Sequence, residues 1–211
     1  MKKPLTLIVR LTKPQIDVSL KNLEAGLTKY LHIQKRFQEL TNKPLNDNTE
    51  FRKSFNGFYR VRQKPAAWYD AFYGLLDESR NQATDFATVL RSLHTLTNRY
   101  EASFASKLLA TLNPHMPVFD SVVLTNLKAK LPYQNDPNRF QRICSLHDEL
   151  SRCYKDYLHS EQGQYLVSQF KKAYPNVDIT EVKMVDLVLW QARQTHSAMV
   201  SFPSTDITSG R

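Results

Sequence analysis

Apolar side chains recur every three or four residues along most of the chain, which is the spacing of one face of an α-helix. One such stripe starts after Pro14 and continues to Leu40, and the longest of the others runs from Pro137 to His159. The chain has only five glycines in 211 residues, and this scarcity favours helices over hairpin-rich sheets. The pattern predicts an all-α, orthogonal multi-helix globular fold of about eight helices.

The two ends of the chain depart from this periodicity. Residues 4–10 are rich in Leu and β-branched side chains and predict a short extended segment. Residues 196–211 are polar, with Ser, Thr, Pro and Gly, and predict a disordered tail. Between the ends, Asn56-Gly57 is a turn signal, and Asp136-Pro137 is typical of a helix start. We expect one helical domain over 1–195.

Positive charge divides this domain into a basic half, 1–64, and a neutral half, 65–195. Residues 1–64 hold 14 Lys and Arg against 5 Asp and Glu, whereas residues 65–211 hold 15 of each. The whole net charge of +9 therefore lies in the first third of the chain. An excess of this size attracts polyanions such as DNA, and the alternative is a solvated surface without a partner.

Aromatic and basic side chains alternate within the basic half, around the sequence FNGFYRVRQK (55–64). Cations that contact phosphates and rings that stack on bases are typical of nucleic-acid binding. On this interpretation the phosphate contacts come from Arg52, Lys53, Arg60, Arg62 and Lys64. The alternative is that the rings belong to the hydrophobic core and that the cations lie on the solvent-exposed surface.

Several classes of site and location find no support in the sequence. No apolar run approaches the roughly 18 residues of a membrane helix, and the apolar run 5–9 is too short for a signal peptide, so we expect a cytoplasmic protein without a membrane partner. Cys144 and Cys153 are too far apart on one helix to pair and are expected to be reduced. The glycine spacing rules out the usual phosphate loops, and Cys144, His147, Cys153 and His159 point in different directions on a helix, so no cofactor and no metal are expected.

Asp120 is the carboxylate that the pattern singles out. It follows a connector that begins at Asn113-Pro114, and it precedes the apolar run from Val122. An aspartate in this position caps the next helix by accepting its free backbone N–H groups, and the helix dipole favours the charged form. A charged carboxylate can also stabilise a developing cation or position a water molecule.

The segment Ala105–Val123 resembles the region around the catalytic aspartate of the helix-hairpin-helix DNA glycosylase superfamily. The matching positions are Ala105, Pro117, Asp120 and Val122. Segments 55–62 and 103–127 together also resemble a family of uncharacterised bacterial proteins, which implies no activity. The chain departs from the glycosylases at 99–103, where it lacks their Gly-x-Gly hairpin, at Glu101, where bifunctional members carry a lysine, and in having too few cysteines for an iron–sulfur cluster.

The resemblance implies a DNA-associated protein in which Asp120 is the catalytic group of an N-glycosylase-like hydrolase. A flipped base would enter a pocket lined by Tyr100, Phe104, Lys107 and Phe119. The alternative, from another class, is a non-enzymatic helical protein-interaction module in which Asp120 is only a helix cap. The sequence does not indicate an oligomeric state.

Overall fold

The computed structural model describes residues 7–41 and 43–198, and within them it contains ten helices and no strand. The predicted all-α fold is confirmed. The helices are α1 (Lys13–Lys21), α2 (Glu24–Glu39), α3 (Thr49–Tyr59), α4 (Ala66–Ser79), α5 (Phe86–Thr97), α6 (Ala102–Leu112), α7 (Ser121–Asn126), α8 (Arg139–His159), α9 (Glu161–Ala173) and α10 (Glu181–Ala198).

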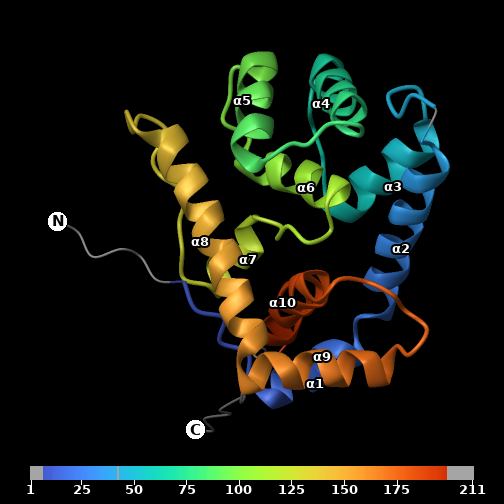
Figure 1. Ribbon diagram of the computed structural model, residues 1–211, viewed down its shortest axis with the longest axis vertical. Coiled ribbons are helices and arrows are strands. Elements are labelled where there is room, and N and C mark those ends of the chain that lie inside the picture. The colour runs from blue at the N-terminus through green and yellow to red at the C-terminus, as the bar shows by residue number, and fades with distance from the viewer. Residues whose placement is uncertain (1–6, 42, 199–211) are drawn as a thin grey trace, which may run out of the picture.

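The helices form two groups that are joined by α2, α3 and the segment between α6 and α7 (Figure 1). In the lower group, α10 packs against α1, α7, α8 and α9. In the upper group, α6 packs against α4 and α5. The long helix α8 runs along one side of the molecule and contacts α5 as well as α9 and α10. Helix α10 therefore lies at the centre of the lower group, although it comes last of the described helices in the sequence.

Three local predictions are wrong. The stripe over 14–40 forms two helices, because the chain turns at Asn22 and Leu23, and Leu23 is buried at the bend. Asn56-Gly57 lies inside α3, and the turn comes instead at Arg60, which adopts the left-handed conformation with φ 54°. Asp136 does not cap α8, which begins at Arg139; its carboxylate accepts a hydrogen bond from the Asn138 amide in the preceding turn.

Both ends of the described chain pack or fold further than their composition indicates. Residues 7–12 carry no regular secondary structure, with Leu7, Val9 and Leu11 buried, and Thr12 caps α1 with Pro14 in its first turn. Residues 4–6 lie outside the described residues. At the other end α10 continues to Ala198, so the predicted tail is helical at 196–198, and residues 199–211 lie outside the described part of the chain.

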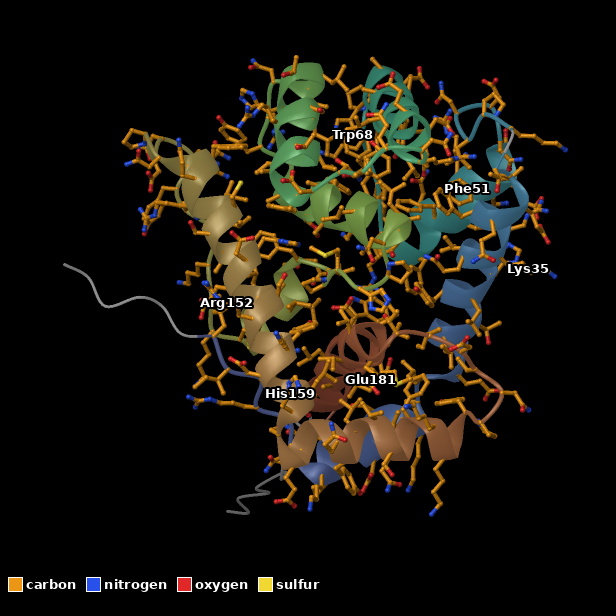
Figure 2. The ribbon with its side chains drawn as sticks, viewed as in Figure 1. Lys35, Phe51, Trp68, Arg152, His159 and Glu181 are labelled. Carbon is orange, nitrogen blue, oxygen red and sulfur yellow. The ribbon has the colours of Figure 1, made fainter. Side chains whose placement is uncertain are left out.

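One hydrophobic cluster extends from Leu7 to Ala192. It takes side chains from all ten described helices and from several of the loops between them. The rings that alternate with basic residues contribute to it: Phe51, Phe55 and Tyr59 are buried along one face of α3. Phe51 is fully buried, whereas Lys35 of α2 is exposed, and Figure 2 shows Lys35 at the outer edge of the molecule. These three rings therefore belong to the core, as the second interpretation of the sequence predicted.

Helix α8 carries both cysteines, and both are free thiols. Within the described residues, none of the helices combines the length and the apolar character that crossing a membrane requires.

The folding stability of the protein is expected to depend on pH through His147 of α8. Its ring is buried and stacks on the ring of Phe86, with the centroids 3.9 Å apart. Burial lowers the pKa of His147 to about 4, and a backbone hydrogen bond at Pro117 partly opposes the shift.

We expect the wild-type protein to lose about 3 kcal/mol of stability through His147 between pH 7 and pH 4. The unfolded chain takes up the proton near pH 6.5 and the folded chain only near pH 4, so the loss sets in as the pH falls through this window. His147→Phe keeps a ring against Phe86 and removes this contribution. Urea unfolding at a series of pH values measures it, with the exposed His32→Phe as control. Equal pH dependence in wild type and His147→Phe would contradict the prediction.

Candidate functional site

The connector between α6 and α7, residues 113–120, is fixed from two sides. The Phe119 amide donates to Ser106 Oγ of α6 at 2.9 Å. The Val118 amide donates to both carboxylate oxygens of Asp186 of α10, at 3.2 and 3.1 Å. Because the amides of Val118 and Phe119 both have acceptors within the protein, the backbone that leads to Asp120 is held in one conformation.

Asp120 caps α7, as the sequence predicted. Its backbone is extended, and its Oδ1 accepts hydrogen bonds from the amides of Val122 at 2.9 Å and Val123 at 3.0 Å. Among the described residues no hydrogen bond reaches the second oxygen, Oδ2. One oxygen of the carboxylate is thus structural, and the other is available to a ligand.

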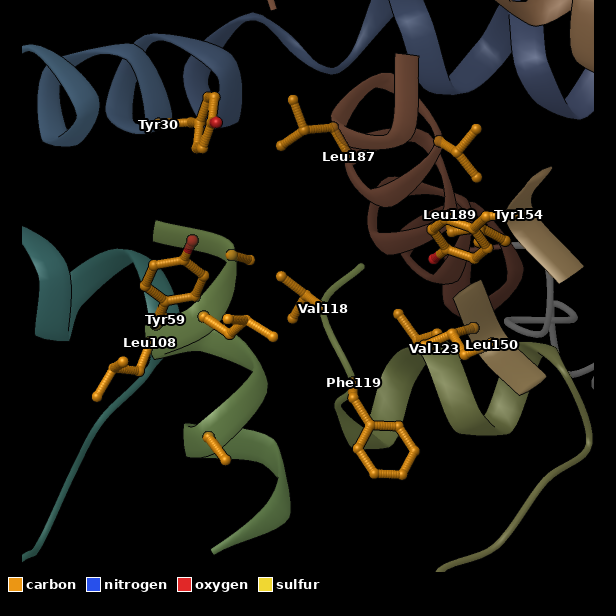
Figure 3. Close-up of a cluster of buried hydrophobic side chains, with 14 of the residues drawn as sticks. Tyr30, Tyr59, Leu108, Val118, Phe119, Val123, Leu150, Tyr154, Leu187 and Leu189 are labelled. Atoms are coloured by element: carbon orange, nitrogen blue, oxygen red, sulfur yellow. The ribbon is translucent and has the colours of Figure 1, made fainter. Parts of the chain in front are cut away.

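A cavity of about 580 Å³ opens beside Asp120. Its walls are the end of α3, one face of α6, the connector with α7, the segment 129–131 and one face of α10. Figure 3 shows Val118 and Phe119 of the connector between the α6 helix of Leu108 and the α7 helix of Val123. This volume is within the range of small-molecule sites, roughly 300–1,000 Å³.

A buried ion pair forms part of the α10 wall. Lys183 Nζ lies 2.7 Å from Asp186 Oδ2, and their side chains are only 3% and 6% exposed. The Tyr154 hydroxyl of α8 donates to Asp186 Oδ1 at 3.0 Å. Burial raises the pKa of the Asp186 carboxyl, and the Lys183 ammonium acts in the opposite direction. Asp186 therefore joins α8, α10 and the connector through one side chain.

Lys107 of α6 is a second buried amine in the cavity wall. Its Nζ donates to the carbonyl of Tyr59 at 3.3 Å and lies 5.1 Å from the centre of the Phe104 ring. Burial lowers the pKa of Lys107; the Asp120 carboxylate opposes this shift, and the Arg60 guanidinium adds to it. The Lys107 ammonium and the Asp120 carboxylate, both at this cavity, thus interact electrostatically.

The exposed rim of the cavity is basic and aromatic. Arg60 lies with its guanidinium carbon 4.9 Å from the centre of the Trp190 ring, and Trp190 in turn lies 6.4 Å from Phe58. Lys130 is exposed at the same cavity. No ion pair among the described residues includes Arg60 or Lys130. Both cations are therefore free to contact an anionic ligand.

The five cations of the predicted phosphate surface do not gather at one place. Of these five, Arg60 alone lines the cavity. Arg52 is held by the Asn46 carbonyl at 2.8 Å and by Asp70 at 3.5 Å. Lys64 pairs with Glu101 at 2.7 Å over the rings of Trp68 and Phe104. Lys53 and Arg62 are exposed.

The four predicted pocket residues are divided in the same way. Lys107 and Phe119 line the cavity. Phe104 packs on Trp68 with ring centroids 4.8 Å apart, behind Lys107. Tyr100 stacks on His94 at 4.1 Å and lines a separate hollow of about 350 Å³ next to α8. Tyr100 is therefore outside the Asp120 cavity.

Sequence reasoning missed Lys183, Asp186 and Trp190. A signal was present, because Lys183 and Asp186 stand three residues apart within the otherwise apolar run 182–190. Two charges of opposite sign on the same buried helix face are stable only as a pair. That Asp186 reaches the connector is a tertiary contact over 68 residues, which no local pattern contains.

The four potential metal ligands of α8 do not converge, and no group of three or more His, Cys, Asp or Glu suited to a metal occurs in the described ranges 7–41 and 43–198. Comparison of the chain with protein-family models, curated proteins and solved structures gives no match.

Proposed function

We propose that the protein binds DNA and takes a displaced nucleobase into the Asp120 cavity. The observation that carries this proposal is the cavity of about 580 Å³, whose lining includes Asp120 with one free carboxylate oxygen, the buried Lys107 and the exposed Arg60. A flipped base needs a pocket with polar groups inside and cations outside for its backbone phosphates. The net charge of +9 supports the same partner.

The chemistry proposed for this site is hydrolysis of an N-glycosidic bond. An ionised carboxylate stabilises the positive charge that develops on the sugar as the bond to the base breaks, or positions the attacking water. The free oxygen of Asp120 is the group for this role, since its other oxygen is already used by the amides of Val122 and Val123. The resemblance at Ala105–Val123 supports the same assignment.

The competing proposal is a non-enzymatic helical module that binds another protein. It is favoured by one observation: Arg52 and Lys64, two of the predicted phosphate ligands, are held within the protein by Asp70 and Glu101. In that case Asp120 serves only as the cap of α7. The two experiments below separate the proposals.

The first experiment measures binding to a duplex oligonucleotide over a range of salt concentrations. We expect affinity to fall steeply with salt, and Arg60→Ala combined with Arg62→Ala to weaken binding and to reduce the salt dependence by about one phosphate contact for each cation lost. The matched control is Lys29→Ala with Lys35→Ala, which removes the same charge from exposed positions of α2 away from the cavity. If the protein does not bind the duplex, or binds it with an affinity that does not depend on salt, the DNA proposal is wrong.

The second experiment separates the cap from the chemistry at Asp120. Asn caps a helix as well as Asp, so Asp120→Asn is expected to leave thermal stability almost unchanged, whereas Asp120→Ala costs about 1 kcal/mol. Release of a base from DNA is expected to disappear in both variants. Activity of Asp120→Asn equal to that of the wild type removes Asp120 from the mechanism.

A further inference from the structure

The hollow of about 350 Å³ next to α8 is separate from the Asp120 cavity. It is lined by Arg91 and His94 of α5, by Tyr100 and by residues of the segment 134–141 that leads into α8. None of these residues lines the Asp120 cavity. The volume lies at the lower end of the range of small-molecule sites, roughly 300–1,000 Å³. The hollow is therefore a second candidate site, with room for a small ligand.

Aromatic rings join the two sides of this hollow. The His94 ring stacks on the Tyr100 ring, with the centroids 4.1 Å apart and the planes at 18°. The Tyr100 ring in turn lies 6.0 Å from the ring of Phe140, in the first turn of α8. The guanidinium carbon of Arg91 lies 5.0 Å from the centre of the same Phe140 ring. These contacts bring a cation of α5 to the first turn of α8.

Two arginines of the hollow have no carboxylate partner. Arg91 is exposed, and no ion pair in the described part of the chain includes Arg91 or Arg139. Arg139 donates through Nη1 to the Pro132 carbonyl. A guanidinium has five N–H donors, so this bond leaves most of the donors of Arg139 unused. Both side chains can therefore donate to an anion in the hollow.

The carboxylate that lines the hollow, Asp136, is already neutralised. Its Oδ2 lies 2.5 Å from Nη1 of Arg142, and its Oδ1 accepts from the Asn138 amide at 2.9 Å. The positive charges of Arg91 and Arg139 are thus not cancelled by the acidic residue of the same hollow.

The backbone at the start of α8 supplements the two arginines. Asn138 precedes α8 without a side-chain cap. The amides of Phe140 and Gln141, two residues that line the hollow, have no acceptor among residues 7–41 and 43–198. Free N–H groups in the first turn of a helix favour an anion.

We propose that this hollow binds the phosphate group of a small phosphate monoester through Arg91 and Arg139. A guanidinium matches the geometry of a phosphate and donates to it in pairs. Near pH 7 a monoester carries a charge of about −1.5 to −2, which two unpaired arginines balance, whereas a phosphate of the nucleic-acid backbone carries a single charge. The rings of His94 and Tyr100 lie against the organic part of the ligand. The site shares no residue with the Asp120 cavity and does not depend on DNA binding.

The test is a titration of the ¹⁵N-labelled full-length protein with phenyl phosphate, followed by NMR. We expect the amide signals of Phe140, Gln141 and Tyr100 to move and to saturate. Arg91→Gln is expected to raise the Kd by roughly 10- to 150-fold, the effect of one hydrogen bond to a charged group. Because Arg91 is exposed and unpaired, this variant keeps the fold. Arg139→Gln is expected to weaken binding to a similar extent.

A matched variant and a matched ligand serve as controls. Arg152→Gln removes the same charge from an exposed position of α8 that does not line the hollow, and it is expected to leave the Kd within about twofold of the wild type. Phenyl methyl phosphate keeps the ring but is a diester with one charge. We expect it to bind at least about tenfold more weakly, since it lacks the second charge. Equal affinity for the diester would assign the hollow to backbone phosphates and overturn the proposal.

The position of the shifted signals distinguishes this site from the Asp120 cavity. If phenyl phosphate moves the amides of Val122 and Val123 in place of those of Phe140 and Gln141, it binds beside Asp120 and the proposal is wrong. The proposal is also wrong if millimolar phenyl phosphate moves no signal, or if Arg91→Gln binds it as the wild type does. None of these results depends on whether the protein binds DNA, so the two proposals fail separately.

Discussion

Replacement of Asp186 by leucine is expected to lower the free energy of unfolding by about 3–5 kcal/mol. The change leaves the Lys183 ammonium buried without its counter-ion, and it removes the acceptor for the Val118 amide and the Tyr154 hydroxyl. For a chain of this size the loss corresponds to a fall in Tm of roughly 6–20 °C. Thermal and urea unfolding measure it directly.

A double variant shows whether the cost comes from the unpaired charge. Lys183→Met with Asp186→Asn removes both charges and keeps an oxygen that accepts from Val118 and Tyr154. We expect this protein to be within about 2 kcal/mol of the wild type, because buried ion pairs replaced as a pair cost little. If the double variant loses as much stability as the single variants Lys183→Met and Asp186→Asn lose together, the pair is not coupled and the explanation is wrong.

Replacement of Gly163 by alanine is expected to cost about 3–5 kcal/mol, through a steric clash. A Cβ atom at this position would lie 1.9 Å from the Tyr157 carbonyl oxygen and 2.8 Å from the Leu158 Cα. Both are backbone atoms at the sharp corner where α8 meets α9, so no side chain can rotate away. Ser160 caps α9 at this corner by accepting from the Gly163 amide at 3.1 Å, and the clash disturbs that cap as well. The measurement is the unfolding midpoint in urea.

The matched control is Gly57→Ala in α3, where a Cβ meets nothing within 4 Å. Alanine in a helix interior is more stable than glycine by about 0.5–1 kcal/mol, so this variant is expected to be stabilised. We therefore predict that the two glycine substitutions change the free energy of unfolding in opposite directions. A similar small effect at both positions would show that the α8–α9 corner relaxes at little cost.

The sequence predicted elements well where the signal was local. The periodic stripes predicted the all-α fold, and the position of Asp120 before Val122 predicted its cap, because both depend on neighbours within one helical turn. The turn predicted at Asn56-Gly57 does not form, because Phe51, Phe55 and Tyr59 are buried together on one face of α3. Burial of three rings outweighs the turn preference of two residues.

The candidate site was predicted only in part, for a similar reason. Lys107 and Phe119 were expected near Asp120, and they line its cavity. Arg52 and Lys64 were grouped with Arg60 because they are close in the sequence, but each has a carboxylate partner from a different helix or loop. Trp190 enters the site from the far end of the chain, and a pattern read along the sequence carries no information on such a contact.

The place of α10 along the chain has a consequence for synthesis. The connector that leads to Asp120 depends on Asp186, and α7 is tied to α10 by the Asn126 side chain, which donates to the Leu189 carbonyl at 2.8 Å. A nascent chain that ends before Glu181 has made every other described helix but lacks one wall of the cavity. The pocket beside Asp120 is therefore complete only after α10 has left the ribosome.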